Sequence, residues 1–274
     1  MNKYLLIIVV IVSFSIHMRG QSYENCIDSI DRYIEKQNWV MAEKSLLSAL
    51  KQRPGNPSNF ILLSNLGTVH RNMGKLDEAL KDYKNALAIT PNAVAILRNR
   101  ALLYLEMDSL ENAYYDYDRI LALDKTDLDA KYYHGMLALG FGEFEIAKGD
   151  FEEALKINKE YVDAKRGMAL LYKIKNDYVK AIEFYSEVIK KENRPETYLS
   201  RAECYIETGQ LSEAGADLME AQKVEPANPD LYVLKAALAE KQYRFDDAEK
   251  YAREAISLGA DRELVAKFFK KKAK

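Results

Sequence analysis

Apolar positions along the chain follow the period of an α-helix in short segments that turn residues separate. Between Asn65 and Pro91, for example, Ala79, Tyr83 and Ala86 follow one another at steps of four and three. Such steps keep side chains on one face of a helix. The stretch therefore predicts two short amphipathic helices folded against each other. The same pattern returns about every 34 residues along the chain.

One alanine marks the repeat most clearly, because it recurs at separations of 33 to 37 residues. It occupies seven positions, Ala42, Ala79, Ala113, Ala147, Ala181, Ala214 and Ala248. The position twelve residues earlier is small in six cases, at Gly67, Ala101, Gly135, Ala169, Ala202 and Ala236. Small side chains at both positions allow two helix axes to approach closely. We therefore expect seven repeats, each of two closely packed helices, that begin at residues 23, 60, 94, 128, 162, 195 and 229.

The remaining marks of the repeat agree with two helices. Gly74, Gly142 and Gly209 fall between the helices of their repeats, where a chain reversal can use positive φ. Pro91 lies where a second helix should stop. Four residues after each marker alanine comes a further buried position of the second helix, held by Leu46, Tyr83, Tyr117, Phe151, Tyr185, Leu218 and Ala252.

This combination resembles the tetratricopeptide repeat family, whose unit is a helix-turn-helix of about 34 residues with small residues at fixed places. The resemblance implies an all-α fold, a right-handed superhelical solenoid of seven helix-turn-helix repeats with a C-terminal capping helix. We expect the repeat array to cover residues 23–261, and a capping helix with a basic tail to cover residues 262–274.

The first 22 residues do not follow the repeat. Lys3 precedes an apolar run from Tyr4 to Ile16, and Gly20-Gln21-Ser22 offers small residues to a signal peptidase. The run of 13 residues is shorter than the roughly 20 that span a bilayer. We therefore predict a signal peptide at 1–22 and an exported protein, periplasmic or secreted. A membrane anchor formed by an uncleaved signal is the alternative.

Charge is high and balanced, with 40 lysines and arginines against 42 aspartates and glutamates. The two signs are interspersed, unlike the basic surface that is typical of nucleic-acid binding. Five lysines surround Phe268 and Phe269 near the end of the chain, and we interpret them as a solvated helix end. We predict no nucleic-acid partner and no stable membrane insertion after signal removal.

Residues with catalytic or metal-binding chemistry are sparse. His70 and His134 lie in the first helices of different repeats, and neither has a second histidine or cysteine at metal-ligand spacing. The glycines between Gly67 and Lys75 lack the spacing of a phosphate loop, and the aspartates around Asp127 lack the glycine of a calcium loop. We predict a protein that is not an enzyme and that binds no cofactor or metal.

A stripe beside the buried positions of each first helix predicts a binding surface. Places 2, 5, 9 and 12 of a repeat lie about 100° round the helix from the buried places and should line the concave side. The family resemblance implies that this face binds extended peptides, with an asparagine at place 6 bonding the ligand backbone. The stripe also includes Leu139, Glu196, Ile206 and Asp230. The partner-binding candidates are Asn65, Thr68, Arg71, Arg98, Asn99, Leu102, Tyr132, Met136, Arg166, Leu170 and Lys173.

We therefore predict a non-catalytic scaffold that binds a protein or an extended peptide, as an exported accessory factor in an envelope assembly. Arg98 beside Asn65 and Asn99 raises the alternative of a carboxylate-binding clamp. The full clamp of chaperone-binding relatives has lysine and asparagine where this chain has Ser64 and Thr68. We accordingly expect ordinary polar lining.

Two further alternatives belong to different classes of function. The first is a structural or oligomerisation subunit that packs through its convex faces. The second is an accessory subunit that holds an enzyme or a saccharide in a groove lined by Tyr132, Tyr133 and Arg166. The sequence leaves the partner and the oligomeric state open.

Overall fold

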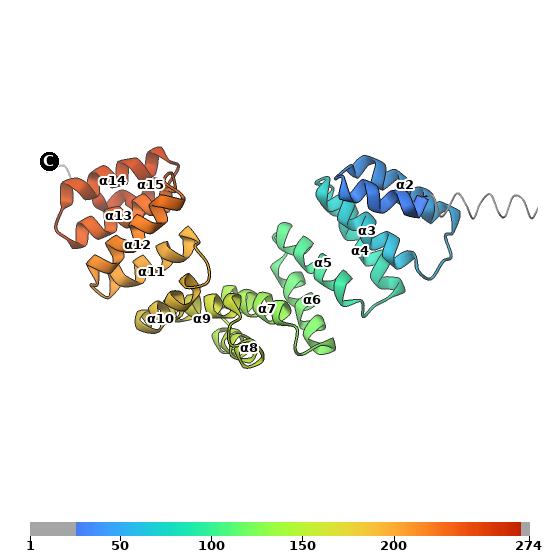
Figure 1. Ribbon diagram of the computed structural model, residues 1–274, viewed down its shortest axis with the longest axis horizontal. Coiled ribbons are helices and arrows are strands. Elements are labelled where there is room, and N and C mark those ends of the chain that lie inside the picture. Colours follow the sequence, from blue (N-terminus) through green and yellow to red (C-terminus); the bar gives the residue numbers. More distant parts are fainter. Residues whose placement is uncertain (1–25, 270–274) are drawn as a thin grey trace, which may run out of the picture. The chain divides into compact units, whose positions relative to one another are not determined.

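A computed structural model of the chain describes residues 26–269, and each regular element among these residues is a helix (Figure 1). The predicted signal peptide and the last lysines of the predicted basic tail lie outside the described residues. The first helical segment covers residues 26–35. It is followed by α2 (Trp39–Gln52), α3 (Asn59–Asn72), α4 (Leu76–Ile89), α5 (Val94–Glu106), α6 (Leu110–Leu123), α7 (Leu128–Gly140), α8 (Phe144–Ile157), α9 (Val162–Ile174), α10 (Tyr178–Ile189), α11 (Pro195–Glu207), α12 (Leu211–Val224), α13 (Pro229–Lys241), α14 (Phe245–Ser257), α15 (Arg262–Val265) and the 3₁₀ helix η1 (Ala266–Phe268). The prediction of an all-α fold is confirmed.

The chain divides into two compact units, whose described residues are 26–130 in the N-terminal unit and 131–269 in the C-terminal unit. Within each unit, consecutive helices pack against each other. In addition, α3 contacts α5 in the N-terminal unit, and α11 contacts α13 in the C-terminal unit. These contacts bring first helices of neighbouring repeats side by side within each unit.

Small residues hold the two helices of a repeat together as the spacing predicted. All seven marker alanines are at most 1% exposed. A Cβ atom at Gly67 would lie 2.8 Å from the ring of Tyr83. The ring of Phe151 is enclosed from two sides, because Cβ atoms at Gly135 and Gly167 would lie 2.7 and 2.5 Å from it. Only glycine fits against these rings without moving them.

The turn between the two helices of each repeat uses one residue with positive φ. Asparagine and aspartate adopt this left-handed conformation more readily than other residues with a side chain. Tyr243 is unusual at such a position, since its bulky side chain makes the backbone conformation strained. The seven residues are Gln37, Gly74, Asp108, Gly142, Asn176, Gly209 and Tyr243, with φ between 52° and 79°.

The C-terminal residues of the described chain cover the last repeat. Asp261 is the N-cap of α15, and its side chain accepts a hydrogen bond from the backbone N–H of Glu263. Val265 and Phe268 are buried in one apolar cluster with alanines of α13 and α14. This packing shields the apolar end of the last helix pair. Among the described residues, no helix combines the length and apolar character needed to cross a membrane.

Candidate partner-binding surface

The eleven predicted binding residues all lie on first helices, and each is partly exposed. Because the chain forms two units, they fall into two groups. The N-terminal group lies on α3 and α5 and consists of Asn65, Thr68, Arg71, Arg98, Asn99 and Leu102. The C-terminal group lies on α7 and α9 and consists of Tyr132, Met136, Arg166, Leu170 and Lys173.

Arg71 is paired with a carboxylate of the next repeat. Its Nε and Nη2 atoms donate to the two carboxylate oxygens of Glu106 at 2.9 and 2.5 Å. The hydrogen bond from Arg71 lowers the pKa of Glu106, and Glu106 in turn raises the pKa of Arg71. Both groups are therefore charged over the physiological pH range, and each is satisfied by the other.

Arg98 is occupied in the same way. It donates to Asp127, and a second guanidinium nitrogen lies 3.5 Å from a carboxylate oxygen of Asp129. Burial lowers the pKa of Arg98, but the hydrogen bond with Asp127 and the negative charges of Asp127 and Asp129 together outweigh burial, and the pKa is raised. A ligand carboxylate at Arg98, as in a carboxylate-binding clamp, would have to displace these aspartates. Asn65 on α3 and Asn99 on α5 are both partly exposed.

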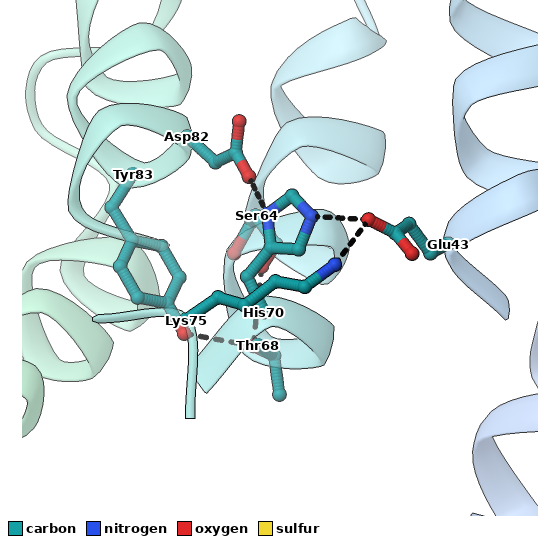
Figure 2. Close-up of polar contacts among 7 residues, drawn as sticks. All are labelled: Glu43, Ser64, Thr68, His70, Lys75, Asp82 and Tyr83. Atoms are coloured by element: carbon teal, nitrogen blue, oxygen red, sulfur yellow. Dashed lines mark hydrogen bonds and ion pairs between the residues drawn. The ribbon is translucent and has the colours of Figure 1, made fainter. Parts of the chain in front are cut away.

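Thr68 holds the edge of a buried ring. Its hydroxyl donates to the backbone carbonyl of Ser64 at 3.1 Å and lies 2.9 Å from the hydroxyl of Tyr83 (Figure 2). Burial raises the pKa of Tyr83, and the hydrogen bond with Thr68 opposes that effect. Thr68 therefore serves the packing of its own repeat. Leu102, on α5, is partly exposed.

His70 joins three helices through a buried network (Figure 2). Its Nδ1 atom lies 2.6 Å from Asp82 on α4, and its Nε2 atom lies 3.0 Å from Glu43 on α2. Lys75 donates to the same oxygen of Glu43 at 2.9 Å. This hydrogen bond lowers the pKa of Glu43, whereas burial raises the pKa of Asp82. Both ring nitrogens are engaged within the protein, which indicates a structural role. Residues 26–269 contain no group of three or more potential ligands that could hold a metal ion.

Arg166 organises the C-terminal group. Its guanidinium donates to Asp163 at 2.5 Å and to Glu192 at 2.7 Å, and it also bonds the hydroxyl of Tyr132. Burial raises the pKa of Tyr132, so this hydroxyl remains protonated and can donate. The ring of Tyr132 meets that of Tyr133 edge to face, with centroids 5.2 Å apart. Tyr132 and Arg166 are therefore held in place before any ligand arrives.

Two other predicted residues, Met136 and Leu170, line a pocket of about 180 Å³ that we term pocket A. Tyr185 completes its apolar wall. Burial raises the pKa of Tyr185 to about 12, against the lowering effect of its hydrogen bond with Ser200. The remaining lining residues are Arg166, Arg194, Glu196, Thr197 and Ser200.

Lys173 lines a second pocket of about 320 Å³, which we term pocket B. Its ammonium group pairs with Glu203 on α11. Pocket B adjoins pocket A, because Glu196 and Ser200 line both. The remaining lining residues are Leu199, Asn228, Asp230, Val233 and Leu234. The stripe of first-helix positions therefore continues onto α11 and α13 as a hollowed surface.

Two residues of the predicted stripe do not belong to this surface. Leu139 is 6% exposed and Ile206 is 3% exposed. Both occupy place 12 of their repeats, near the end of a first helix. Their side chains are part of the packed interior, because a step round the helix fixes direction only and the neighbouring helices decide burial.

The polar pairs within repeats are a feature that the apolar pattern missed. In three repeats a basic residue of the first helix pairs with an aspartate 16 residues later. In the fifth repeat the same two places hold Met168 and Phe184. The regular spacing of 16 was the available signal. The three pairs are Arg100–Asp116, His134–Asp150 and Arg201–Asp217, with shortest distances of 2.6, 2.6 and 2.7 Å.

Paired helices whose first members lie side by side define an α-helical repeat protein, a class that generally presents an interaction surface rather than a catalytic pocket. A TPR repeat model matches residues 67–108, and tetratricopeptide repeat models match residues 132–197 and 195–228. A tetratricopeptide repeat protein from Parabacteroides merdae is 32% identical, over 91% of this chain and 98% of that chain, with a TM-score of 0.75. The chain belongs to the tetratricopeptide repeat family.

More distant solved structures share the fold. PilF from Pseudomonas aeruginosa is 19% identical over 78% of this chain and 96% of its own, with a TM-score of 0.63. YrrB, described as a TPR protein with an unusual peptide-binding site, is 21% identical over 68% of this chain and 96% of its own, with a TM-score of 0.53. A search of curated protein sequences found no match.

Proposed function

We propose that this protein is a non-catalytic scaffold that binds a partner protein through the first helices of its repeats, as an exported accessory factor in an envelope assembly. The proposal takes residues 1–22 as a signal peptide, residues 23–261 as the repeat array and residues 262–274 as a capping helix with a basic tail. The observation that carries it is the pair of adjoining pockets A and B on the C-terminal unit.

The pockets have the composition of a binding surface. Met136, Leu170 and Tyr185 give pocket A an apolar wall beside a small number of polar groups. Apolar pockets with few oriented polar groups are typical of the anchor points of protein interfaces. A micromolar complex needs about 8 kcal/mol, and one neutral hydrogen bond contributes only about 0.5–1.5 kcal/mol. Binding through several such contacts at once therefore fits this surface better than a single polar clamp.

Site-specific photo-crosslinking in the native host tests the proposal. A benzophenone amino acid is introduced at Leu170 in pocket A, and at Ile146 on α8 as a control position that is 45% exposed. We expect a specific crosslinked protein from position 170 and none from position 146, in the envelope fraction of the cells.

Other outcomes separate the alternatives. A crosslink to a second copy of the chain from position 146 would favour the oligomerisation subunit. A saccharide adduct at position 170 would favour the accessory subunit for a glycan. Recovery of the complex only from the cytosol would contradict export.

A further inference from the structure

Pocket B carries negative charge that the protein does not compensate. Three carboxylates, of Glu196, Glu203 and Asp230, face one ammonium group, that of Lys173. Lys173 is paired with Glu203. Glu196 and Asp230 form no ion pair with any residue of the described chain. Two exposed carboxylates that line the pocket are therefore available to a cation from outside.

Part of the wall of pocket B is apolar. Leu199, Val233 and Leu234 line it, and its volume is about 320 Å³. Lysine and arginine bury their aliphatic stems along apolar surface while the charged head remains among polar groups. Charge-assisted hydrogen bonds between such a head and a carboxylate are roughly twice as strong as neutral ones. Pocket B thus offers a lysine or arginine side chain both apolar surface and negative charge, and it repels a carboxylate.

Pocket A differs from pocket B in being mainly apolar and in offering a buried polar group. Its volume of about 180 Å³ exceeds the roughly 150 Å³ of an apolar protein cavity that holds benzene. Thr197 lines the pocket and is only 4% exposed. Its hydroxyl has no hydrogen-bond partner within residues 26–269. The hydroxyl oxygen is not among the fully buried polar atoms without a partner, so it can form a hydrogen bond with a ligand backbone in pocket A.

We propose that the C-terminal unit binds an extended segment of a partner protein that places an apolar side chain in pocket A and a lysine or arginine side chain in pocket B. This inference rests on the proposed function and specifies the chemistry of the partner. The two side chains are close together along the segment, because the pockets share Glu196 and Ser200 and an extended chain advances about 3.3 Å per residue. The partner has the opposite charge from the ligand of a carboxylate-binding clamp.

Selection from a displayed library of random dodecapeptides against the full chain tests the inference. We expect the selected peptides to share an apolar residue close to a lysine or arginine. The best peptide is then labelled with fluorescein and titrated with the full chain by fluorescence anisotropy. The double variant E196Q/D230N should weaken its affinity at least tenfold. The control E213Q removes an exposed carboxylate from the first turn of α12, outside both pockets, and should leave the affinity within twofold.

Charge reversal provides a gain-of-function arm. The variant E196K/D230K should bind a version of the peptide in which glutamate replaces the basic residue, and it should reject the original peptide. Circular dichroism and the urea midpoint of each variant verify that the helices remain folded. Loss of the original peptide without gain of the glutamate version, in a folded variant, would overturn the inference.

The variant L170R, which fills pocket A, separates this inference from the proposed function. The selected peptides could require Leu170 and yet lack a basic residue, with an affinity that E196Q/D230N leaves unchanged. This result would overturn the inference while the scaffold function stands. If no peptide is selected, or if L170R leaves binding intact, the proposed peptide-binding face itself is rejected. A dimer of the full chain in sedimentation that L170R dissociates would assign the pockets to a second copy, and it would also overturn the inference.

Discussion

The two units carry the same first-helix stripe but balance its charges differently. In the N-terminal unit the stripe arginines are satisfied from within, Arg71 by Glu106 and Arg98 by Asp127. In the C-terminal unit the stripe cations are also paired, but Glu196 and Asp230 have no such partner within the described residues. The residue type at a stripe position therefore does not decide whether its charge is available to a ligand. The pairing across neighbouring repeats decides it.

The units also differ inside their repeats. Arg100 and Asp116 form a charged pair between the helices of one repeat in the N-terminal unit. The corresponding places in the fifth repeat, in the C-terminal unit, hold Met168 and Phe184. The same helix interface therefore accepts either a charged pair or an apolar pair. It should not accept a charged residue at one place and an apolar residue at the other, because a buried charge without a partner is strongly destabilising.

The largest effect on stability is expected from a substitution that removes one partner of the charged pair. Arg100→Met leaves Asp116, which is 0% exposed, without its partner, and it should lower the free energy of unfolding by about 3–5 kcal/mol. The double variant R100M/D116F copies the apolar pair of the fifth repeat and should recover most of that loss. Urea unfolding followed by circular dichroism measures both. A double variant as unstable as R100M would show that the interface depends on the charged pair itself.

A second, smaller effect compares the two cysteines. Burial raises the pKa of Cys204, in the C-terminal unit, to about 11 from an ordinary value of 9.0. A rise of two units lowers the thiolate fraction at pH 8 about 100-fold, and the thiolate is the reactive form. In the variant C26S, alkylation of Cys204 by iodoacetamide should be at least about 100-fold slower in the folded chain than in urea, because the thiol is also 0% exposed. Cys26, in the N-terminal unit, is partly exposed and should react faster in the variant C204S.

The stability of the protein should depend on pH through the same thiol. Because burial disfavours the thiolate, the folded protein keeps the proton to higher pH than the unfolded chain does. The stability contributed by the protonated thiol should therefore fall as the pH rises from about 9 to about 11, and the variant C204S should not show this fall. Urea midpoints of the two proteins that change in parallel between about pH 9 and pH 11 would contradict burial of the thiol.

The smallest effect on stability is expected from glycine-to-alanine substitutions at the helix contacts of the two units. Gly167→Ala places a methyl group 2.5 Å from the ring of Phe151 in the C-terminal unit, and Gly67→Ala places one 2.8 Å from Tyr83 in the N-terminal unit. Each should cost about 1–3 kcal/mol, with G167A the more destabilising. The control G149A in α8 meets nothing within 4 Å and should stabilise the helix by about 0.5–1 kcal/mol. Equal thermal midpoints for G167A and G149A would refute the close packing.

The helices and their register could be predicted because they depend on local, periodic spacing. The marker alanines and the residues four positions later are buried as their steps require, from Leu46 to Ala252. The ion pairs between repeats could not be predicted in this way. Arg71 and Glu106 are 35 residues apart, and Lys173 and Glu203 are 30 apart, so their meeting depends on how neighbouring repeats stack and which rotamers their side chains adopt.

The polar pairs inside the repeats, which lie outside the candidate surface, could have been predicted from the sequence. The constant spacing of 16 residues between Arg100 and Asp116, and between Arg201 and Asp217, is as regular as the alanine spacing. A search restricted to apolar periodicity passes over it. The pockets are a different matter, because a hollow depends on which side chains fail to fill the space between α9, α11 and α13, and no spacing rule reports that.

The ring of Phe151 packs against glycines of two successive repeats, Gly135 and Gly167. Substitutions at these three positions therefore depend on one another. A larger residue at 135 or 167 becomes tolerable only if the residue at 151 shrinks at the same time, so substitutions there must occur together or not at all. Evolution or engineering that adds, removes or exchanges whole repeats therefore meets a barrier at this junction, since a repeat from another context would bring the wrong partner for the ring.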